Sequence, residues 1–118
     1  MIEVFLYIMV LHFIGDFLLQ SDRIATNKST NNEVLSEHVF IYFGTLLTGG
    51  IFAFGLAGAL LYASANAILH LGTDYVTSRV AREFYMRGER HNFFVTIGAD
   101  QLIHTVCLGV TYSWLLVQ

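Results

Sequence analysis

The chain has 118 residues, of which 55% are hydrophobic and only 13% are charged, and its mean hydropathy is +0.59. Because soluble domains usually carry about twice this share of charge, the composition favours a membrane protein. A net charge of −3 with only six Lys and Arg residues argues against a polyanion-binding surface, so no nucleic acid partner is expected. The length fits one domain of about four membrane spans.

The first predicted span covers about residues 2–19 and is apolar apart from Glu3, His12 and Asp16. It lacks the basic start and the small-residue cleavage site of a secretory signal, so it is expected to be retained. A polar stretch rich in Ser, Thr and Asn follows and continues to Glu33. This stretch is expected to form a loop or a short surface helix.

The second and third predicted spans share an uncharged stretch, residues 39–71. As one helix this stretch would measure roughly 50 Å, which is far longer than one bilayer crossing. The sequence Thr48-Gly49-Gly50 is therefore expected to form a tight turn. This turn would separate a span at about 34–47 from another at about 51–71.

The fourth predicted span covers about residues 93–117, after a helical pattern that continues past Asp74 and breaks at Gly88. The expected fold is an all-α, four-helix transmembrane bundle that forms a single membrane domain, residues 1–118. All six cationic side chains lie in the first and third connections: Arg23, Lys28, Arg79, Arg82, Arg87 and Arg90. The positive-inside rule then makes both connections cytoplasmic and both termini external, in a multi-pass protein of the inner (cytoplasmic) membrane.

Histidine and aspartate stand four residues apart three times, which places each pair on one face of a helix. With the topology above, these pairs and His38 all fall in the cytoplasmic half of the bundle. Ionisable groups are costly in hydrocarbon and usually mark function there. The predicted metal ligands are therefore His12, Asp16, His38, His70, Asp74, Asp100 and His104.

Each of these residues also has a structural interpretation. The three pairs could be ordinary interhelical contacts, and His38 could be an interfacial histidine at the start of a helix. His91 lies between Arg90 and Asn92 and is expected to be solvated. Cys107 is expected to be a buried free thiol rather than a ligand.

The ligand types indicate the metal. Four histidines and three aspartates form a nitrogen and oxygen set that suits zinc, manganese or iron, and zinc is the metal predicted. One or two zinc ions are expected. Because one zinc needs three or four protein ligands, seven would suit two ions that share an aspartate and keep positions open for water. Because such a pair acidifies bound water and can hold the oxygens of a phosphoryl or acyl centre, the chemistry indicated is metal-assisted hydrolysis.

The segment His12-Phe13-Ile14-Gly15-Asp16 resembles the His-x-x-Gly-Asp motif of the zinc-dependent phospholipase C and P1 nuclease superfamily. Most of the chain is more similar to the DUF3307 family of small bacterial or phage membrane proteins, loosely linked to membrane-bound metal-dependent hydrolases. The matching positions are His12, Asp16, Gln20, Asn27, Lys28, His38, His70, Asp74, Asp100, Gln101 and His104. The resemblance to the superfamily implies zinc ligation by His12 and Asp16 and hydrolysis of phosphate esters. Its three-zinc site is not expected, because no histidine closely follows Gln20.

The function predicted is that of a membrane-embedded hydrolase acting on a phosphoester or lipid headgroup at the cytoplasmic face. Its expected partners are membrane lipid and this substrate, and the sequence is compatible with a homo-oligomer. Asp16 and Asp100 are its predicted catalytic residues. Lys28 and Arg79 are weaker candidates for phosphate contacts, because basic residues at a membrane edge also attract anionic lipid. Residues that could orient ligands are Gln20, Asn66 and Gln101.

Two other functions are compatible with the same residues. One is a transport or sensing module for protons or metal ions, although the outer half of each predicted span is apolar and disfavours a continuous path. The other is a non-catalytic membrane interaction protein in which a metal only fastens the bundle.

Overall fold

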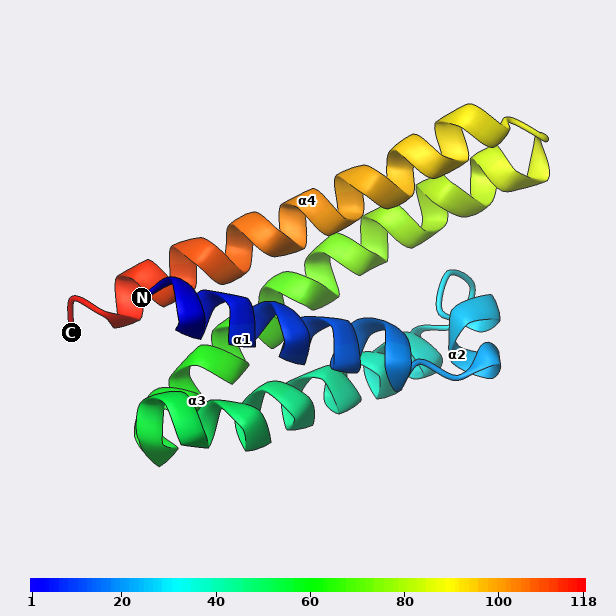
Figure 1. Cartoon of the computed structure of the whole chain (residues 1–118). Helices are drawn as coiled ribbons and strands as arrows, with labels where there is room; N and C mark the ends of the chain where they lie inside the picture. The colour runs from blue at the N-terminus through cyan, green and yellow to red at the C-terminus, as the bar shows by residue number, and fades with distance from the viewer.

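The computed structural model describes residues 1–118 and contains only helices, which confirms the all-α fold class. Figure 1 shows how these helices are arranged in space. In chain order they are α1 (Ile2–Phe13), the π-helix η1 (Ile14–Leu18), α2 (Asp22–Asn27), α3 (Asn32–Met86) and α4 (Arg90–Leu115). The short helix α2 falls in the polar stretch where a loop or a surface helix was predicted.

The helix α3 consists of two antiparallel arms, residues 32–54 and 56–86, that meet at Gly55 (Figure 1). Gly55 has φ 68° and ψ 175°, a conformation that side-chain-bearing residues rarely adopt. The turn predicted at Thr48-Gly49-Gly50 is therefore wrong, because this sequence is helical. Gly50 serves close packing instead: a Cβ atom there would lie 3.2 Å from the Cβ of Ala59 in the other arm.

Local signals set the other helix ends. The Asn31 side chain accepts hydrogen bonds from the backbone N–H groups of Glu33 and Val34 and so caps the start of α3. Gly88, with φ 71°, separates α3 from α4 where the predicted break lies. The polar residues after Asp74 continue the second arm of α3 as far as Met86, well beyond the apolar stretch.

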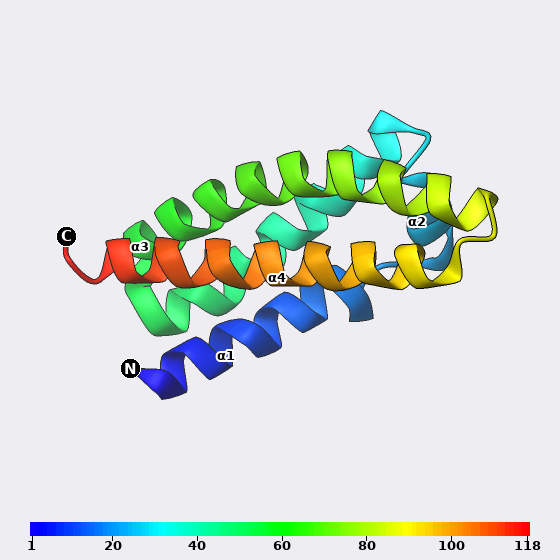
Figure 2. The same ribbon diagram turned by 90° about the horizontal axis from the view of Figure 1, so that it is seen from above.

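The bundle has a hydrophobic half and a polar half. The α4 helix runs beside the second arm of α3, and α1 packs against the first arm and α4 (Figures 1 and 2). The buried hydrophobic cluster lies toward the two termini. Its members are Ile8, Leu11, Tyr42, Leu46, Tyr62, Ala63, Leu108 and Tyr112. The seven predicted ligands lie beyond this cluster, toward α2 and the α3–α4 connection.

Two helices, α3 and α4, are long and apolar enough to cross a membrane. Much of the outer surface is also apolar: Phe40, Phe52, Ile68, Leu102 and Val110 are 63–85% exposed. The two termini lie at one end of the molecule, whereas α2 and the α3–α4 connection lie at the other (Figures 1 and 2). The basic residues therefore gather at one end, away from both termini.

Candidate metal centre

The structure brings the seven predicted ligands together from α1, η1, α3 and α4. Six of them are at most 6% exposed, and Asp100 is half-buried. Three overlapping groups have ligand atoms close enough to hold a metal ion. The central group is Asp16, His38, His70 and Asp74, and the flanking groups are His12, Asp16 and His104, and Asp74, Asp100 and His104.

A wide helical turn positions Asp16. The first span was expected to be one continuous α-helix, but residues 14–18 form a π-helix in which the Leu19 N–H donates to the Ile14 carbonyl at 2.9 Å. Single π turns inside α-helices are frequent at functional sites. Gly15 lets this turn approach α3 closely, because a Cβ atom there would lie 3.0 Å from the Tyr42 ring and 3.3 Å from the Cβ of Thr45.

Gly15→Ala is expected to weaken zinc binding by about 10-fold, in the range of changes to groups that orient metal ligands. The added methyl group would displace Tyr42, whose ring packs on His70. Gly44→Ala is the matched control, because nothing lies within 4 Å of its Cβ position. Zinc titration of the two variants in detergent tests this; equal affinities would show that the packing of Gly15 against α3 does not affect metal binding.

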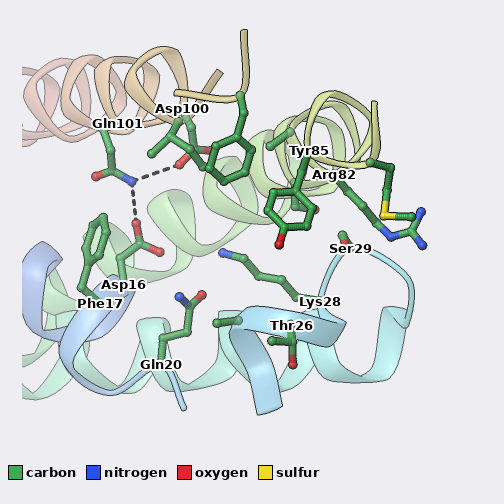
Figure 3. A pocket seen from close by; sticks show the side chains of 16 residues that line it. Asp16, Phe17, Gln20, Thr26, Lys28, Ser29, Arg82, Tyr85, Asp100 and Gln101 are labelled. Carbon is green, nitrogen blue, oxygen red and sulfur yellow. Dashed lines mark hydrogen bonds between the residues drawn. The ribbon is translucent and has the colours of Figure 1, made fainter. Parts of the chain in front are cut away.

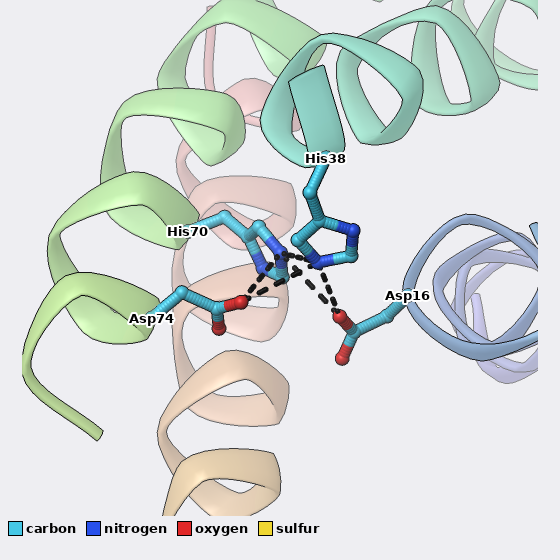
Figure 4. Close-up of side chains that lie close together, drawn as sticks. All are labelled: Asp16, His38, His70 and Asp74. Carbon is cyan, nitrogen blue, oxygen red and sulfur yellow. Dashed lines mark hydrogen bonds and ion pairs between the residues drawn. The ribbon is translucent and has the colours of Figure 1, made fainter. Parts of the chain in front are cut away.

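In the central group, four side chains from three separate helical segments point at one another (Figure 4). The Nε2 atom of His38 lies 3.1 Å from Asp16 Oδ1, 3.4 Å from Asp74 Oδ2 and 3.1 Å from the Nε2 of His70. The His70 Nε2 atom lies 3.4 Å from Asp16 Oδ1 and 3.7 Å from Asp74 Oδ2. Four tetrahedral ligands about 2.0–2.1 Å from zinc would be separated by about 3.3–3.4 Å. The five separations, 3.1–3.7 Å, lie around this value, so the central group could hold a four-coordinate metal ion.

The flanking position beside Asp74 contains several buried atoms without a hydrogen bond. Asp74 turns Oδ2 toward the central group and Oδ1 toward His104, whose Nε2 atom is 3.4 Å away. Asp74 Oδ1 and both ring nitrogens of His104 have no hydrogen-bond partner. Buried polar atoms are rarely left unpaired. Asp74, Asp100 and His104 can each offer one ligand atom within 4.8 Å of the others, so this position could hold a second ion that shares Asp74.

His12 is less available as a ligand than the other three histidines. Its Nδ1 atom shares a 3.0 Å hydrogen bond with the Tyr42 hydroxyl, and its Nε2 atom shares one of 3.0 Å with the Gln101 side-chain oxygen. Gln101 also donates to Asp16 and Asp100, each at 3.0 Å. Gln101 therefore joins both predicted catalytic aspartates to His12.

Tyr42 belongs to the site although it was not predicted. Besides the hydrogen bond to His12, its ring stacks on His70 at a centroid distance of 4.0 Å and an interplanar angle of 10°. Tyr42 follows His38 by four residues, so it lies on the same helical face. The spacing that identified the His/Asp pairs could have identified it as well.

Lys28 and Arg79, the two candidates for phosphate contacts, lie in different parts of the structure. The Lys28 ammonium, on a side chain only 16% exposed, donates to Asp74 Oδ2 at 2.7 Å. Arg79 lies away from the site: it donates to Asn32 and to the Tyr75 carbonyl and stacks on the Tyr75 ring. Lys28 therefore lies next to the centre, whereas nothing places Arg79 there.

The three residues expected to orient ligands also differ in where they lie. Asn66 bonds to Thr111 and to the Tyr62 carbonyl, so it joins α3 to α4 away from the ligand groups. Gln20 lines a cavity beside the centre, and its side-chain oxygen is buried without a partner. Of the three residues expected to orient ligands, only Gln101 contacts a predicted ligand.

A cavity of about 540 Å³ opens beside the metal-binding groups, between η1–α2 and the polar end of the α3–α4 pair. In Figure 3, Asp16 and Gln101 lie at one side of it, and Lys28 extends its ammonium into the middle. Arg82, which the sequence did not single out for phosphate contact, lines the cavity near Tyr85. A volume of this size is typical of small-molecule sites.

Comparison with known protein families gives one match. The family described as "Protein of unknown function (DUF3307)" matches residues 4–118, a range that contains every residue of the three ligand groups. No curated protein and no solved structure matches the chain.

Proposed function

The chain belongs to the DUF3307 family, whose description assigns no activity, and we propose that it is a membrane-embedded, zinc-dependent hydrolase of phosphoesters. The site would face the cytoplasmic surface of the inner membrane. The observation that carries this proposal is the buried cluster of two imidazoles and two carboxylates beside a cavity that contains an ammonium group.

Zinc is the proposed metal because of the donor set and its spacing. Two histidine nitrogens and two aspartate oxygens suit zinc, and separations of 3.1–3.7 Å between these atoms are compatible with its preferred four-coordinate geometry. Asp74, His104 and Asp100 would hold a second zinc, and Asp74 belongs to both groups. Structural zinc sites are usually closed, whereas Asp16 and Asp100 border an open cavity, as a catalytic site requires.

The surface supports the membrane setting. Large exposed apolar patches on a soluble protein are rare, yet apolar side chains cover much of this surface. The polar end carries the basic residues, so the positive-inside rule would place it in the cytoplasm with both termini outside. The ligand groups lie in the half of the bundle nearer this end.

The proposed reaction transfers a phosphoryl group from an alcohol to water. A water oxygen forms a bond to phosphorus, the bond between phosphorus and the alcohol oxygen breaks, and the departing alcohol takes up a proton. Zinc would supply acidification of that water and neutralisation of phosphate charge. When only the central group holds zinc, Asp100 is not a ligand, borders the cavity and can accept the proton that the water loses. Lys28 can bind a phosphate oxygen.

Transport by the same residues is less well supported. A conduction path would need polar lining through the full depth of the bundle. Toward the termini, however, Ile8, Leu46, Tyr62 and Leu108 fill the interior and are at most 2% exposed. These residues would close the bundle beyond the ligand groups.

Metal content and phosphate release together test the proposed function. Protein purified in detergent is expected to contain zinc and to release phosphate from alkyl phosphates. A chelator should abolish turnover, and added zinc should restore it. Asp16→Asn removes a central carboxylate and should lose both zinc and turnover while its circular dichroism stays helical.

Asp22→Asn, which alters an exposed carboxylate at the start of α2, is the control and should behave as the unmodified protein. Full turnover in Asp16→Asn, or in chelated protein, would contradict the proposal. Stoichiometric zinc without turnover on any phosphoester would instead indicate a structural metal site.

A further inference from the structure

We infer, on the basis of the proposed hydrolase function, that the substrate is an amphiphile with a single apolar chain. Its phosphate would bind between the metal centre and Lys28, and its chain would lie against the apolar wall of the neighbouring cavity. This narrows the substrate class from phosphoesters in general to membrane-soluble, single-chain phosphoesters.

The polar end of the cavity suits a phosphate group. Asp16, Asp100 and Gln101 border it, so a ligand there lies directly beside the metal-binding groups. An ammonium has three N–H donors, and Lys28 uses one of them on Asp74. The other two donors can bind an anionic ligand. Arg82 lies at the other end of the cavity in Figure 3, so Lys28 is the basic residue next to the metal-binding groups.

The rest of the wall suits an apolar chain. Phe17, Tyr85, Met86 and Ile97 line the same cavity and are 39–68% exposed, and Phe93 lies beside Tyr85 with ring centroids 5.6 Å apart. A small hydrophilic ester would gain nothing from these side chains. An alkyl chain would bury them, and each buried methylene strengthens binding by about fourfold at most.

The cavity volume favours one chain. About 540 Å³ is within the range of sites for small ligands, and the phosphate end takes part of it. The wall leads from the metal-binding groups to exposed apolar side chains on η1, α3 and α4. The chain of a membrane-dissolved substrate could therefore enter from the lipid side while its phosphate reaches Lys28.

Chain length is the variable that tests this inference. Zinc-loaded protein in lipid nanodiscs would be assayed with butyl, hexyl and octyl phosphate. We expect kcat/KM to rise about two- to fourfold per methylene for the unmodified protein. Ile97→Ser should flatten this dependence, because Ile97 lines the cavity. Ile103→Ser is the matched control, since Ile103 is on the same helix, is 43% exposed against 39% for Ile97, and does not line the cavity.

Lys28→Met tests the phosphate contact separately. It should raise KM for all three esters by about tenfold or more and leave the dependence on chain length unchanged, because it changes no apolar side chain of the wall. Zinc content is measured on the same sample, because the variant also loses the hydrogen bond to Asp74. A dependence on chain length that is absent, or that Ile97→Ser and Ile103→Ser retain equally, would overturn the inference and leave the proposed hydrolysis intact. Equal dependence on chain length in Ile97→Ser and Ile103→Ser would mean that partition of the longer esters into lipid alone explains the rise in kcat/KM.

Binding of octyl phosphate distinguishes failure of the inference from failure of the proposed function. Zinc-loaded Asp100→Asn should bind octyl phosphate without turning it over, and calorimetry can measure this. Binding that depends on Ile97, combined with no turnover in the unmodified protein, would support the amphiphile site and contradict the hydrolase. Absence of both binding and turnover would contradict both.

Discussion

Replacing His38 with alanine is expected to lower zinc affinity by more than about 100-fold and to leave less than one zinc ion per chain after dialysis. Changes to residues that merely orient metal ligands cost about 10–100-fold, so loss of a ligand should cost more. His38 is 0% exposed, and its Nε2 atom faces three other atoms of the central group. Elemental analysis of the detergent-purified variant measures the effect.

His91→Ala is the matched control, because His91 is exposed at the start of α4 and belongs to none of the three ligand groups. It should retain the full zinc content. Circular dichroism of both variants separates loss of a ligand from loss of the fold. Full zinc content in a helical His38→Ala variant would remove the central group as the metal site.

Asp100→Asn is expected to reduce kcat by about 10²–10⁴-fold, the usual contribution of a positioned acid or base. The substitution keeps the shape and an oxygen that can accept from Thr77, but the amide cannot take a proton from water. The central group does not include Asp100, so at least its zinc should stay bound. Phosphate release and zinc content measured on the same sample test both statements.

Zinc content separates the two possible roles of Asp100. Unchanged kcat with normal zinc content would exclude Asp100 as the base. Loss of all zinc together with kcat would show that Asp100 acts as a ligand of the whole centre instead.

The general form of the bundle follows from the sequence, but the position of its central turn does not. Adjacent glycines favoured a turn at Gly49 and Gly50, yet the chain reverses at Gly55. A glycine can be needed for its backbone conformation or for the space that its missing side chain leaves. Gly50 serves the second purpose and Gly55 the first, and composition alone does not distinguish them.

The gathering of the seven predicted ligands could be predicted from the sequence, because ionisable groups in apolar segments need polar partners and each pair lies on one helical face. How available each of the seven side chains is to a metal ion depends on how its helix is rotated about its axis. Both ring nitrogens of His12 are taken by Tyr42 and Gln101, whereas both of His104 are free. The same rotation places Arg82 in the cavity wall while Arg79, three residues earlier, bonds to Asn32.

The π turn at residues 14–18 also fixes the length of the chain between the first helix and α2. It holds one residue more than an α-helical turn of similar rise, so deletion of a single residue here would restore a regular helix. The residues of the turn would then point in other directions from the helix axis. Asp16 would lose its orientation toward His38, although no predicted ligand had been replaced.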